Sequence, residues 1–158
     1  MMNTKKVIRL AALDLDGTTL HSDKSLSEYT IQTLEKAHDQ GMHIVVASGR
    51  SFASLPEQVT GIYLTSSVPT LLEIADEKAG KAAALAFLAD YLQIPQEAIV
   101  AFGNAENDID MICWAGIGVA VENSPEEVRR AADEITSTND EDGVARWIAR
   151  KQLSDSRI

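Results

Sequence analysis

The sequence predicts an α/β fold built on a doubly wound, mainly parallel sheet. Two observations predict it: short apolar segments alternate with helical patterns, and several of these segments end abruptly in polar residues. The chain has 158 residues, of which 45% are hydrophobic, which is enough for one domain with a sizeable core. We therefore expect residues 1–158 to form a single core domain.

The first part of the chain gives a strand, loop, helix and strand in order. Residues 7–13 form a buried apolar run, and residues 25–28 (SLSE) are a plausible helix start with a carboxylate in the first turn. Gly41 is a plausible helix stop, and residues 42–47 form a second buried run. Two further apolar runs flank the turn signal at residues 66–69. We interpret residues 62–75 as a β-hairpin.

The second part continues the alternation. Residues 81–92 are rich in Ala and Leu and predict an amphipathic helix. Ser124 is a candidate N-cap, with Pro125 in the first turn. The remaining expected elements are strands at 98–102, 117–121 and 134–136, and helices at 106–114 and 140–151.

Charge and composition argue against several classes of protein. The formal net charge of −10 argues against nucleic acid or an anionic membrane as the main partner. The one cysteine, Cys113, allows neither an intramolecular disulfide nor a cysteine-based zinc site. Neither a signal peptide nor a run long enough to cross a membrane is evident. We therefore expect a soluble, cytoplasmic protein.

Two carboxylates follow the first predicted strand. Asp14 and Asp16 stand two positions apart, so that one can serve as nucleophile and metal ligand while the other transfers protons. Gly17 allows close backbone approach, and Thr18 supplies a hydroxyl. A solvated turn is the alternative, because such turns are rich in Asp and Gly.

Polar residues also follow the second predicted strand and open a later helix. The Ser48 hydroxyl and nearby amides can bind phosphate oxygens, although Ser-Gly is also a common turn. Lys81 begins a helix, where the helix dipole disfavours a cation. A solvated lysine is the simpler interpretation, and a lysine that neutralises phosphate charge would also explain the position.

A third polar group follows the strand at residues 98–102. Asn104 and Asp108 carry the hard oxygen ligands that Mg²⁺ prefers. Capping of the next helix by Asn104 or Asn107 is compatible with that role. Because ligands of such sheets bind beyond the carboxyl ends of the strands, these groups predict one site. The acidic run at residues 139–142 predicts a helix start rather than a second metal site, and His21 a surface histidine.

The ordered motifs resemble the haloacid dehalogenase superfamily, in particular its Cof-like sugar-phosphate phosphatases. The resemblance rests on DLDGT at 14–18, ASGR at 47–50, Lys81 and GNAENDIDM at 103–111, and it covers nearly the whole chain.

The resemblance implies a magnesium-dependent phosphatase acting on a small phosphorylated metabolite. Asp14 would be the nucleophile and Asp16 the general acid and base. Phosphate would be held by Ser48, Gly49, Lys81 and Asn107, and Lys81 would also pair with the nucleophile. Mg²⁺ would be held by Asp14, the Asp16 backbone carbonyl, Asn104 and, directly or through water, Asp108.

Two departures from the family pattern matter. The family has Asp where this chain has Asn104, and the lost charge should weaken metal binding. Cof-like enzymes also carry a large cap between the motifs of Ser48 and Lys81, where this chain has only a short segment. We interpret 62–75 as a residual cap hairpin and expect self-association through it.

Two other functions stay open at this stage. A catalytically weakened, phosphate-binding or regulatory relative would fit the Asn104 replacement. A receiver-like protein also uses a phosphorylated Asp in a doubly wound fold, but the DLDGT motif after the first strand argues against it.

Overall fold

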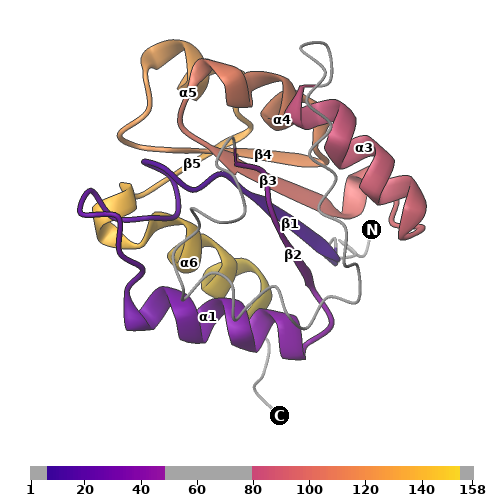
Figure 1. Cartoon of the computed structure of the whole chain (residues 1–158), viewed down its shortest axis with the longest axis horizontal. Coiled ribbons are helices and arrows are strands. Elements are labelled where there is room, and N and C mark those ends of the chain that lie inside the picture. Colours follow the sequence, from indigo (N-terminus) through magenta and orange to yellow (C-terminus); the bar gives the residue numbers. More distant parts are fainter. Residues whose placement is uncertain (1–6, 49–79, 154–158) are drawn as a thin grey trace, which may run out of the picture.

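The fold is organised around a parallel five-stranded sheet with the strand order β2-β1-β3-β4-β5 (Figure 1). The structure is a computed structural model that describes residues 7–48 and 80–153. Its strands are β1 (Leu10–Leu13), β2 (His43–Val46), β3 (Ile99–Gly103), β4 (Ile117–Val121) and β5 (Glu134–Thr136). Every neighbouring pair is parallel, so the predicted α/β fold with a doubly wound parallel sheet is confirmed.

Helices cover both faces of this sheet (Figure 1). The α-helices are α1 (Glu28–Asp39), α3 (Lys81–Tyr91), α4 (Ile109–Trp114), α5 (Glu126–Ala131) and α6 (Gly143–Ile148). Short 3₁₀ segments lie at Gln96–Ala98, Glu106–Asp108 and Asn139–Glu141, and a π-helical turn at Ala149–Leu153 follows α6. Figure 1 shows α1 and α6 on one face and α3, α4 and α5 on the other.

Strand β1 supplies both hydrophobic cores because successive side chains of a strand point to opposite faces. Ala11 and Leu13 join the core beneath α1 and α6, whereas Leu10 and Ala12 join the core beneath α3 and α4. All four side chains are buried. This explains why the sequence of this strand is a continuous apolar run rather than an alternating one.

Helix α1 begins within the segment predicted as its start, residues 25–28. Ser27 caps the helix by accepting a hydrogen bond from the Thr30 amide at 3.0 Å, and Glu28 lies in the first turn. Ser25 is held in a preceding turn, where its amide and hydroxyl both bond to the Asp23 carboxylate.

Ser124 does not cap α5 as the sequence predicted. The N-cap position belongs to Pro125, and the Ser124 hydroxyl is buried without a hydrogen-bond partner. The Ser124 amide instead closes a turn to the Val121 carbonyl at 3.0 Å, which places the residue before the helix.

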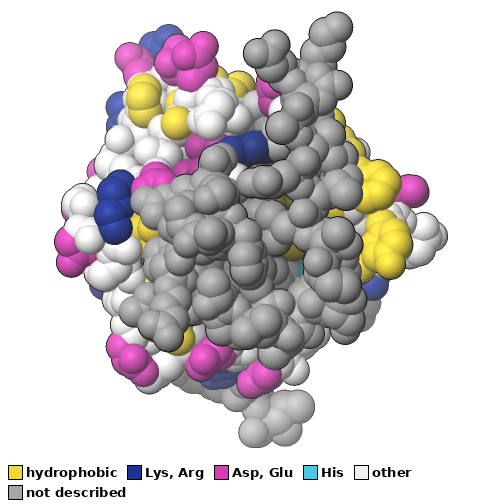
Figure 2. Space-filling model, in the orientation of Figure 1, with side chains coloured by type: hydrophobic (Ala, Val, Ile, Leu, Met, Phe, Trp, Pro, Cys, Tyr) yellow, Lys and Arg dark blue, Asp and Glu magenta, His cyan; other side chains and the backbone are white. Residues whose placement is uncertain are grey.

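Helix α3 is present where it was predicted, but it is not amphipathic. Leu85 and Ala89 are buried against the sheet, while Phe87 and Tyr91 are 62% and 66% exposed. Hydrophobic side chains accordingly appear on the molecular surface at the side where α3 lies (Figure 2).

Some expectations lie outside the described residues. The hairpin at 62–75, and with it the residual cap and the expected self-association, stays a prediction, as does the phosphate contact of Gly49. Within 7–48 and 80–153, no helix combines the length and apolar character needed to cross a bilayer.

Substitution of Trp147 tests the packing of the core beneath α1 and α6. Its side chain is fully buried, its ring packs edge-to-face on Phe102 with centroids 5.3 Å apart, and Nε1 donates to Glu134 at 2.9 Å. We expect Trp147→Ala to lower the free energy of unfolding by about 4 kcal/mol. Urea unfolding measures this loss. Phe87→Ala is the control, because Phe87 is exposed and its replacement should change the free energy of unfolding by less than about 0.5 kcal/mol. Equal losses in the two variants would contradict this packing.

Candidate active site

The register of the sheet brings three loops to one edge. Leu13 pairs with Val46 of β2 and with Phe102 of β3, so these strands end at the same level. The Asp14 amide donates to the Phe102 carbonyl at 3.0 Å, which fixes Asp14 at the carboxyl end of β1. Sites of doubly wound folds form at this edge.

Asp14 is buried, and both of its carboxylate oxygens are engaged. Oδ1 accepts from Lys81 Nζ at 2.6 Å, and Oδ2 accepts from Thr18 Oγ1 at 3.0 Å. The Thr19 hydroxyl donates to the Asp14 backbone carbonyl at 2.6 Å. The carboxylate is therefore oriented by side chains from its own loop and from α3.

Lys81 lies between two carboxylates. Its Nζ also donates to Asp108 Oδ1 at 2.5 Å, and the lysine side chain is only 14% exposed. Lys81 is the first residue of α3, and its N-cap Gly80 contributes no side-chain hydrogen bond. The two carboxylates compensate the unfavourable position of a cation at a helix start.

Asp108 is fully buried and bonded through both oxygens. Its Oδ2 accepts from the amides of Asn104 at 2.9 Å and Ala105 at 3.0 Å. A Cβ on Gly103 would lie 2.4 Å from Asp108 Cβ, so glycine is needed there for this close packing. Asp108 thus ties the loop after β3 to Lys81.

The cluster formed by Asp14, Lys81 and Asp108 holds two acidic groups and one basic group. Burial raises the pKa of Asp14 above its ordinary value, Lys81 opposes this by attracting the carboxylate, and the nearby Asp108 charge raises it again. Two carboxylates share one ammonium group. A further positive charge beside Asp14 would therefore favour the ionised, nucleophilic form.

The side chain of Asn104 reaches the same loop from the end of β3. Its amide nitrogen, assigned from the hydrogen-bond network, lies within hydrogen-bond distance of three oxygens: Asp14 Oδ2 at 3.2 Å, Asp16 O at 3.0 Å and Thr18 Oγ1 at 3.0 Å. Gly17 has a φ of +75°, and a Cβ there would lie 2.5 Å from the Asn104 amide. Both the backbone conformation and the close approach require glycine.

The other predicted site residues are less enclosed. The Asp16 side chain is 40% exposed, and its Oδ1 pairs with Lys24 Nζ at 2.8 Å. Ser48 follows β2 and is partly buried, while Asn107 is exposed in the 3₁₀ segment Glu106–Asp108. The structure thus brings Asp14, Lys81, Asn104 and Asp108 into contact and leaves Asp16 and Asn107 nearer to solvent.

The oxygens available around Asp14 fit a hard divalent cation. Over the described ranges, no cluster of three or more His, Cys, Asp or Glu side chains could hold a metal ion. The position between the Asp14 carboxylate, the Asp16 carbonyl and the Asn104 side chain combines a carboxylate, a backbone carbonyl and an amide, a donor set that suits Mg²⁺. Asp108 has both oxygens occupied and suits an indirect role.

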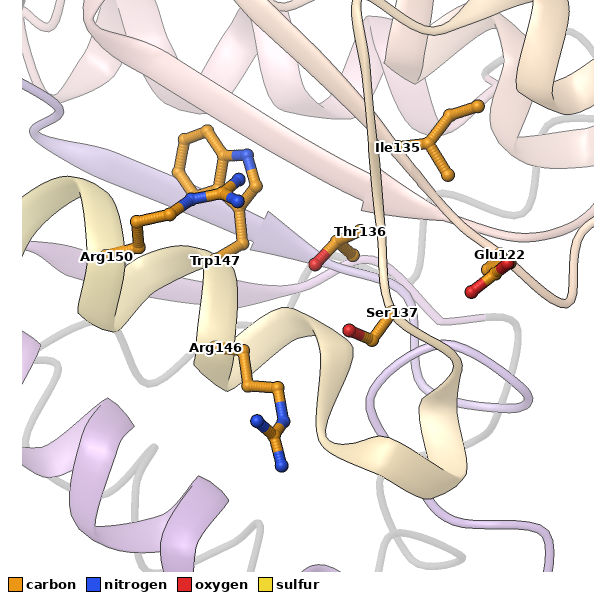
Figure 3. A pocket seen from close by; sticks show the side chains of 7 residues that line it. All are labelled: Glu122, Ile135, Thr136, Ser137, Arg146, Trp147 and Arg150. Carbon is orange, nitrogen blue, oxygen red and sulfur yellow. The ribbon is translucent and has the colours of Figure 1, made fainter.

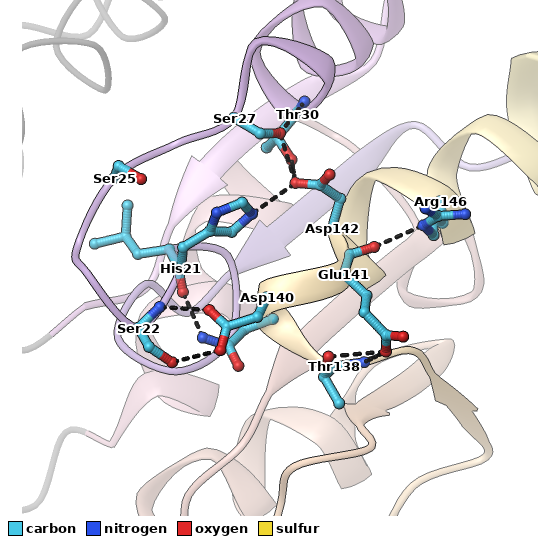
Figure 4. A network of polar contacts seen from close by, with 12 residues as sticks. His21, Ser22, Ser25, Ser27, Thr30, Thr138, Asp140, Glu141, Asp142 and Arg146 are labelled. Carbon is cyan, nitrogen blue, oxygen red and sulfur yellow. Dashed lines mark hydrogen bonds and ion pairs between the residues drawn. The ribbon is translucent and has the colours of Figure 1, made fainter.

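Asp142 anchors the segment after β1, and sequence reasoning missed it (Figure 4). Its Oδ1 meets His21 Nε2 at 2.8 Å and accepts from the Ser27 hydroxyl at 2.5 Å and the Thr30 hydroxyl at 3.0 Å. Asp142 has a φ of 57°, a left-handed conformation that Asp tolerates better than most residues. His21 is therefore a structural contact rather than a surface histidine.

Neighbouring polar residues reinforce this anchor. Asp140 accepts from the Ser22 amide at 2.7 Å and from its hydroxyl at 2.6 Å (Figure 4). Asn139 Nδ2 donates to the Leu20 carbonyl at 2.9 Å, and Asn123 Nδ2 donates to the Gly17 carbonyl at 2.8 Å. The acidic run at 139–142 thus fixes residues between Leu20 and Thr30, while Asn123 holds the loop that follows Asp14 and Asp16. The expected role of the run at a helix start agrees with the 3₁₀ segment Asn139–Glu141.

A separate pocket lies beside β5 and α6 (Figure 3). It is lined by Glu122, Ile135, Thr136, Ser137, Arg146, Trp147 and Arg150. These residues include none of the predicted site residues, so the pocket and the Asp14 cluster are distinct features.

Comparison with protein families decides the relationship that the motifs suggested. The chain matches the family described as haloacid dehalogenase-like hydrolase over residues 11–62 and 53–148. The chain belongs to the haloacid dehalogenase-like hydrolases. The resemblance inferred from residues 14–18, 47–50, 81 and 103–111 is confirmed.

Relatives of this haloacid dehalogenase-like chain match parts of longer proteins. A Haemophilus influenzae relative is 29% identical over 146 residues, which are 89% of this chain and 56% of the relative. Two 5-amino-6-(5-phospho-D-ribitylamino)uracil phosphatases of Bacillus subtilis also match. YitU is 42% identical over 49% of this chain and 29% of its own length. YcsE is 46% identical over 54% of this chain and 34% of its own length. The chain thus spans about half, or less, of the length of these relatives.

Solved structures agree in fold. A haloacid dehalogenase-like hydrolase from Bacteroides thetaiotaomicron has a TM-score of 0.75 at 20% identity, covering 90% of this chain and 99% of its own. The 3-deoxy-D-manno-octulosonate 8-phosphate phosphatase of Moraxella catarrhalis has a TM-score of 0.69 at 23% identity, covering 98% of this chain and 95% of its own. At these identities the likeness supports the fold.

Removal of the Lys81 charge tests the cluster. Lys81→Met leaves two buried carboxylates facing each other, and we expect a loss of about 3 kcal/mol in the free energy of unfolding at neutral pH. Lys24→Met is the matched control, because the Lys24 and Asp16 side chains are 56% and 40% exposed and such pairs contribute at most about 1 kcal/mol. Denaturant unfolding measures both. A Lys81 loss no greater than the Lys24 loss would contradict the arrangement.

The Asp142 anchor predicts a pH dependence. Burial alone would raise the pKa of Asp142, but hydrogen bonds from Ser27, His21 and Thr30 outweigh it and hold the pKa below its usual value. Because the folded-state pKa lies below the unfolded value of about 3.9, the stabilisation is present above that pH and is lost as the pH falls through the folded-state pKa.

We therefore expect Asp142→Asn to be less stable than the native chain by about 1–3 kcal/mol at neutral pH. The difference should shrink as the pH falls below the unfolded value of about 3.9 and through the folded-state pKa. Urea unfolding across this range measures it, with the exposed Asp39→Asn as a control for the loss of one charge. A difference that does not change with pH would rule out the anchoring role of the ionised carboxylate.

Proposed function

We propose that the chain is a magnesium-dependent phosphomonoester hydrolase that acts through an aspartyl-phosphate intermediate on a small phosphorylated metabolite of the sugar-phosphate class. The observation that carries the proposal is the Asp14 carboxylate, oriented by Lys81 and Thr18 at the carboxyl end of β1. A carboxylate that is buried, fixed and beside an ammonium group is suited to attack an anionic phosphorus centre.

In the first step an Asp14 carboxylate oxygen attacks phosphorus as the ester P–O bond breaks. The leaving alcohol oxygen takes the proton that the Asp16 carboxyl group carries once its ion pair with Lys24 has opened. In the second step ionised Asp16 removes a proton from water, whose oxygen attacks the phosphorus of the aspartyl phosphate. Inorganic phosphate leaves and Asp14 is restored as a carboxylate.

The exposure of the Asp16 side chain suits a group that gives a proton to the leaving alcohol and later takes one from water. Its side chain and that of Lys24 are 40% and 56% exposed, so their ion pair is weakly held and can separate when substrate arrives.

Charge neutralisation falls to Lys81 and to the cation. Lys81 Nζ can contact the transferring phosphoryl group together with Ser48, Gly49 and Asn107. Asp14, the Asp16 carbonyl and Asn104 would hold Mg²⁺, and Asp108 would support the site indirectly. When bound, Mg²⁺ neutralises negative charge on the phosphoryl oxygens and fixes their position.

The comparisons support the substrate class. YitU and YcsE are named as phosphatases of a phosphorylated ribityl compound, and the Moraxella catarrhalis structure is described in complex with magnesium and phosphate ions. The family membership and the acidic surface both favour a small phosphate ester over nucleic acid or membrane.

A second candidate function is a phosphate-binding or regulatory role with weakened catalysis. The observation that favours it is the Asn104 amide, whose nitrogen faces Asp14 and the Asp16 carbonyl where a cation would bind. Phosphate binding without turnover would distinguish this function from the first.

The test is release of inorganic phosphate from an aryl phosphate and from panels of sugar phosphates and nucleotides, with magnesium or with a chelator. We expect magnesium-dependent release by the native chain and a loss of at least about a thousandfold in Asp14→Asn. Circular dichroism of the variant controls for folding. Release that is equal in the two proteins would exclude Asp14 as nucleophile, and absence of release from both would favour the second function.

A further inference from the structure

The Asn104 side chain lies where three acceptor oxygens converge. Its terminal amide is 3.2 Å from Asp14 Oδ2, 3.0 Å from the Asp16 carbonyl oxygen and 3.0 Å from Thr18 Oγ1. With the carbonyl oxygen in this position, the Thr18 hydroxyl could donate to it only by giving up its hydrogen bond to Asp14 Oδ2, and the NH₂ group would be left against donors. With the nitrogen there, both ends of the amide are matched.

The surrounding loop enforces this contact. Gly17 has a φ of +75° and leaves no room for a side chain beside Asn104. The Gly17 carbonyl is held by Asn123 Nδ2 at 2.8 Å, and the Asn104 backbone amide is held by Asp108 Oδ2 at 2.9 Å. The acceptors and the amide are therefore brought together from two loops that are each fixed independently.

The same two oxygens, Asp14 Oδ2 and the Asp16 carbonyl, belong to the proposed magnesium position. An amide N–H can donate to them but cannot bind a cation, whereas the amide oxygen can bind a cation but cannot donate. The two states require opposite orientations of one side chain.

We propose that Asn104 acts as a built-in hydrogen-bond donor that substitutes for the cation in the metal-free protein. Its Nδ2 satisfies Asp14 and the Asp16 carbonyl, and cation binding requires the amide to turn by half a rotation so that Oδ1 faces the metal. The inference rests on the proposed cation position, but not on phosphatase turnover.

A carboxylate at position 104 would behave in the opposite way. In the absence of metal it would place a further negative charge against the buried Asp14 carboxylate, which already shares the Lys81 ammonium group with Asp108. With metal present it would supply a charged ligand without any amide turn. Compared with Asp at position 104, Asn104 therefore binds the cation more weakly but makes the metal-free site more stable.

The test is thermal unfolding of the full chain in a chelator and in magnesium chloride, for the native protein, Asn104→Asp and Asn107→Asp. Asn107 is exposed in the same loop, so its variant controls for the added charge. In the chelator we expect Asn104→Asp to unfold about 3–6 °C below the native chain. Asn107→Asp should stay within about 1 °C of it.

Magnesium should raise the unfolding temperature of Asn104→Asp more than that of the native chain. Titration calorimetry with magnesium alone should give a dissociation constant at least about tenfold lower for Asn104→Asp. An Asn104→Asp protein as stable as the native chain in the chelator, or with unchanged magnesium affinity, would overturn the proposal.

A measurement on the native chain keeps the test decisive if Asn104→Asp fails to fold. The side-chain NH₂ resonances of Asn104 in a ¹⁵N-labelled sample should be protected from solvent exchange in the chelator and lose that protection as magnesium is added. Identical protection in both conditions would overturn the proposal. None of these readouts measures phosphate release, so they stand apart from the phosphatase assay.

Discussion

The ion pairs of Lys81 with Asp14 and Asp108 are the interaction on which the site depends. They join the loop after β1, the first residue of α3 and the loop after β3 through one ammonium group. All three side chains are largely buried, so solvent screens these contacts little. The cluster still carries more negative than positive charge. It is therefore both a structural junction and a place where another cation is electrostatically favoured.

Much of the fold follows from the sequence because buried strands leave a direct signal. β1, β3 and β4 are short apolar runs that end in polar or small residues, and all three lie where they were predicted. The placement of Asp14 at the end of β1 follows from that pattern. The start of α5 at Pro125 does not, because the turn from Val121 to Ser124 takes the place of the expected Ser124 cap.

Local sequence pattern could not supply contacts between distant residues, although the family resemblance implied that Lys81 pairs with the nucleophile. Lys81 meets Asp14 across 67 positions, and His21 meets Asp142 across 121. From local pattern alone, a solvated lysine and a surface histidine are the simpler interpretations. The parallel register of β1 and β3 and the close packing at Gly17 and Gly103 bring the loops of the site together. The spacing of residues along the chain indicates neither the register nor the packing.

The central claim is that the Asp14 carboxylate, held by Lys81, is a nucleophile for phosphoryl transfer. Fluorine NMR of the chain with beryllium fluoride at saturating magnesium tests it directly, because trifluoroberyllate binds an aspartate carboxylate as a stand-in for a phosphoryl group. The account predicts a bound fluorine signal in the native chain that is absent from folded Asp14→Asn. A folded native chain without such a signal, or a signal that survives in the variant, would contradict it.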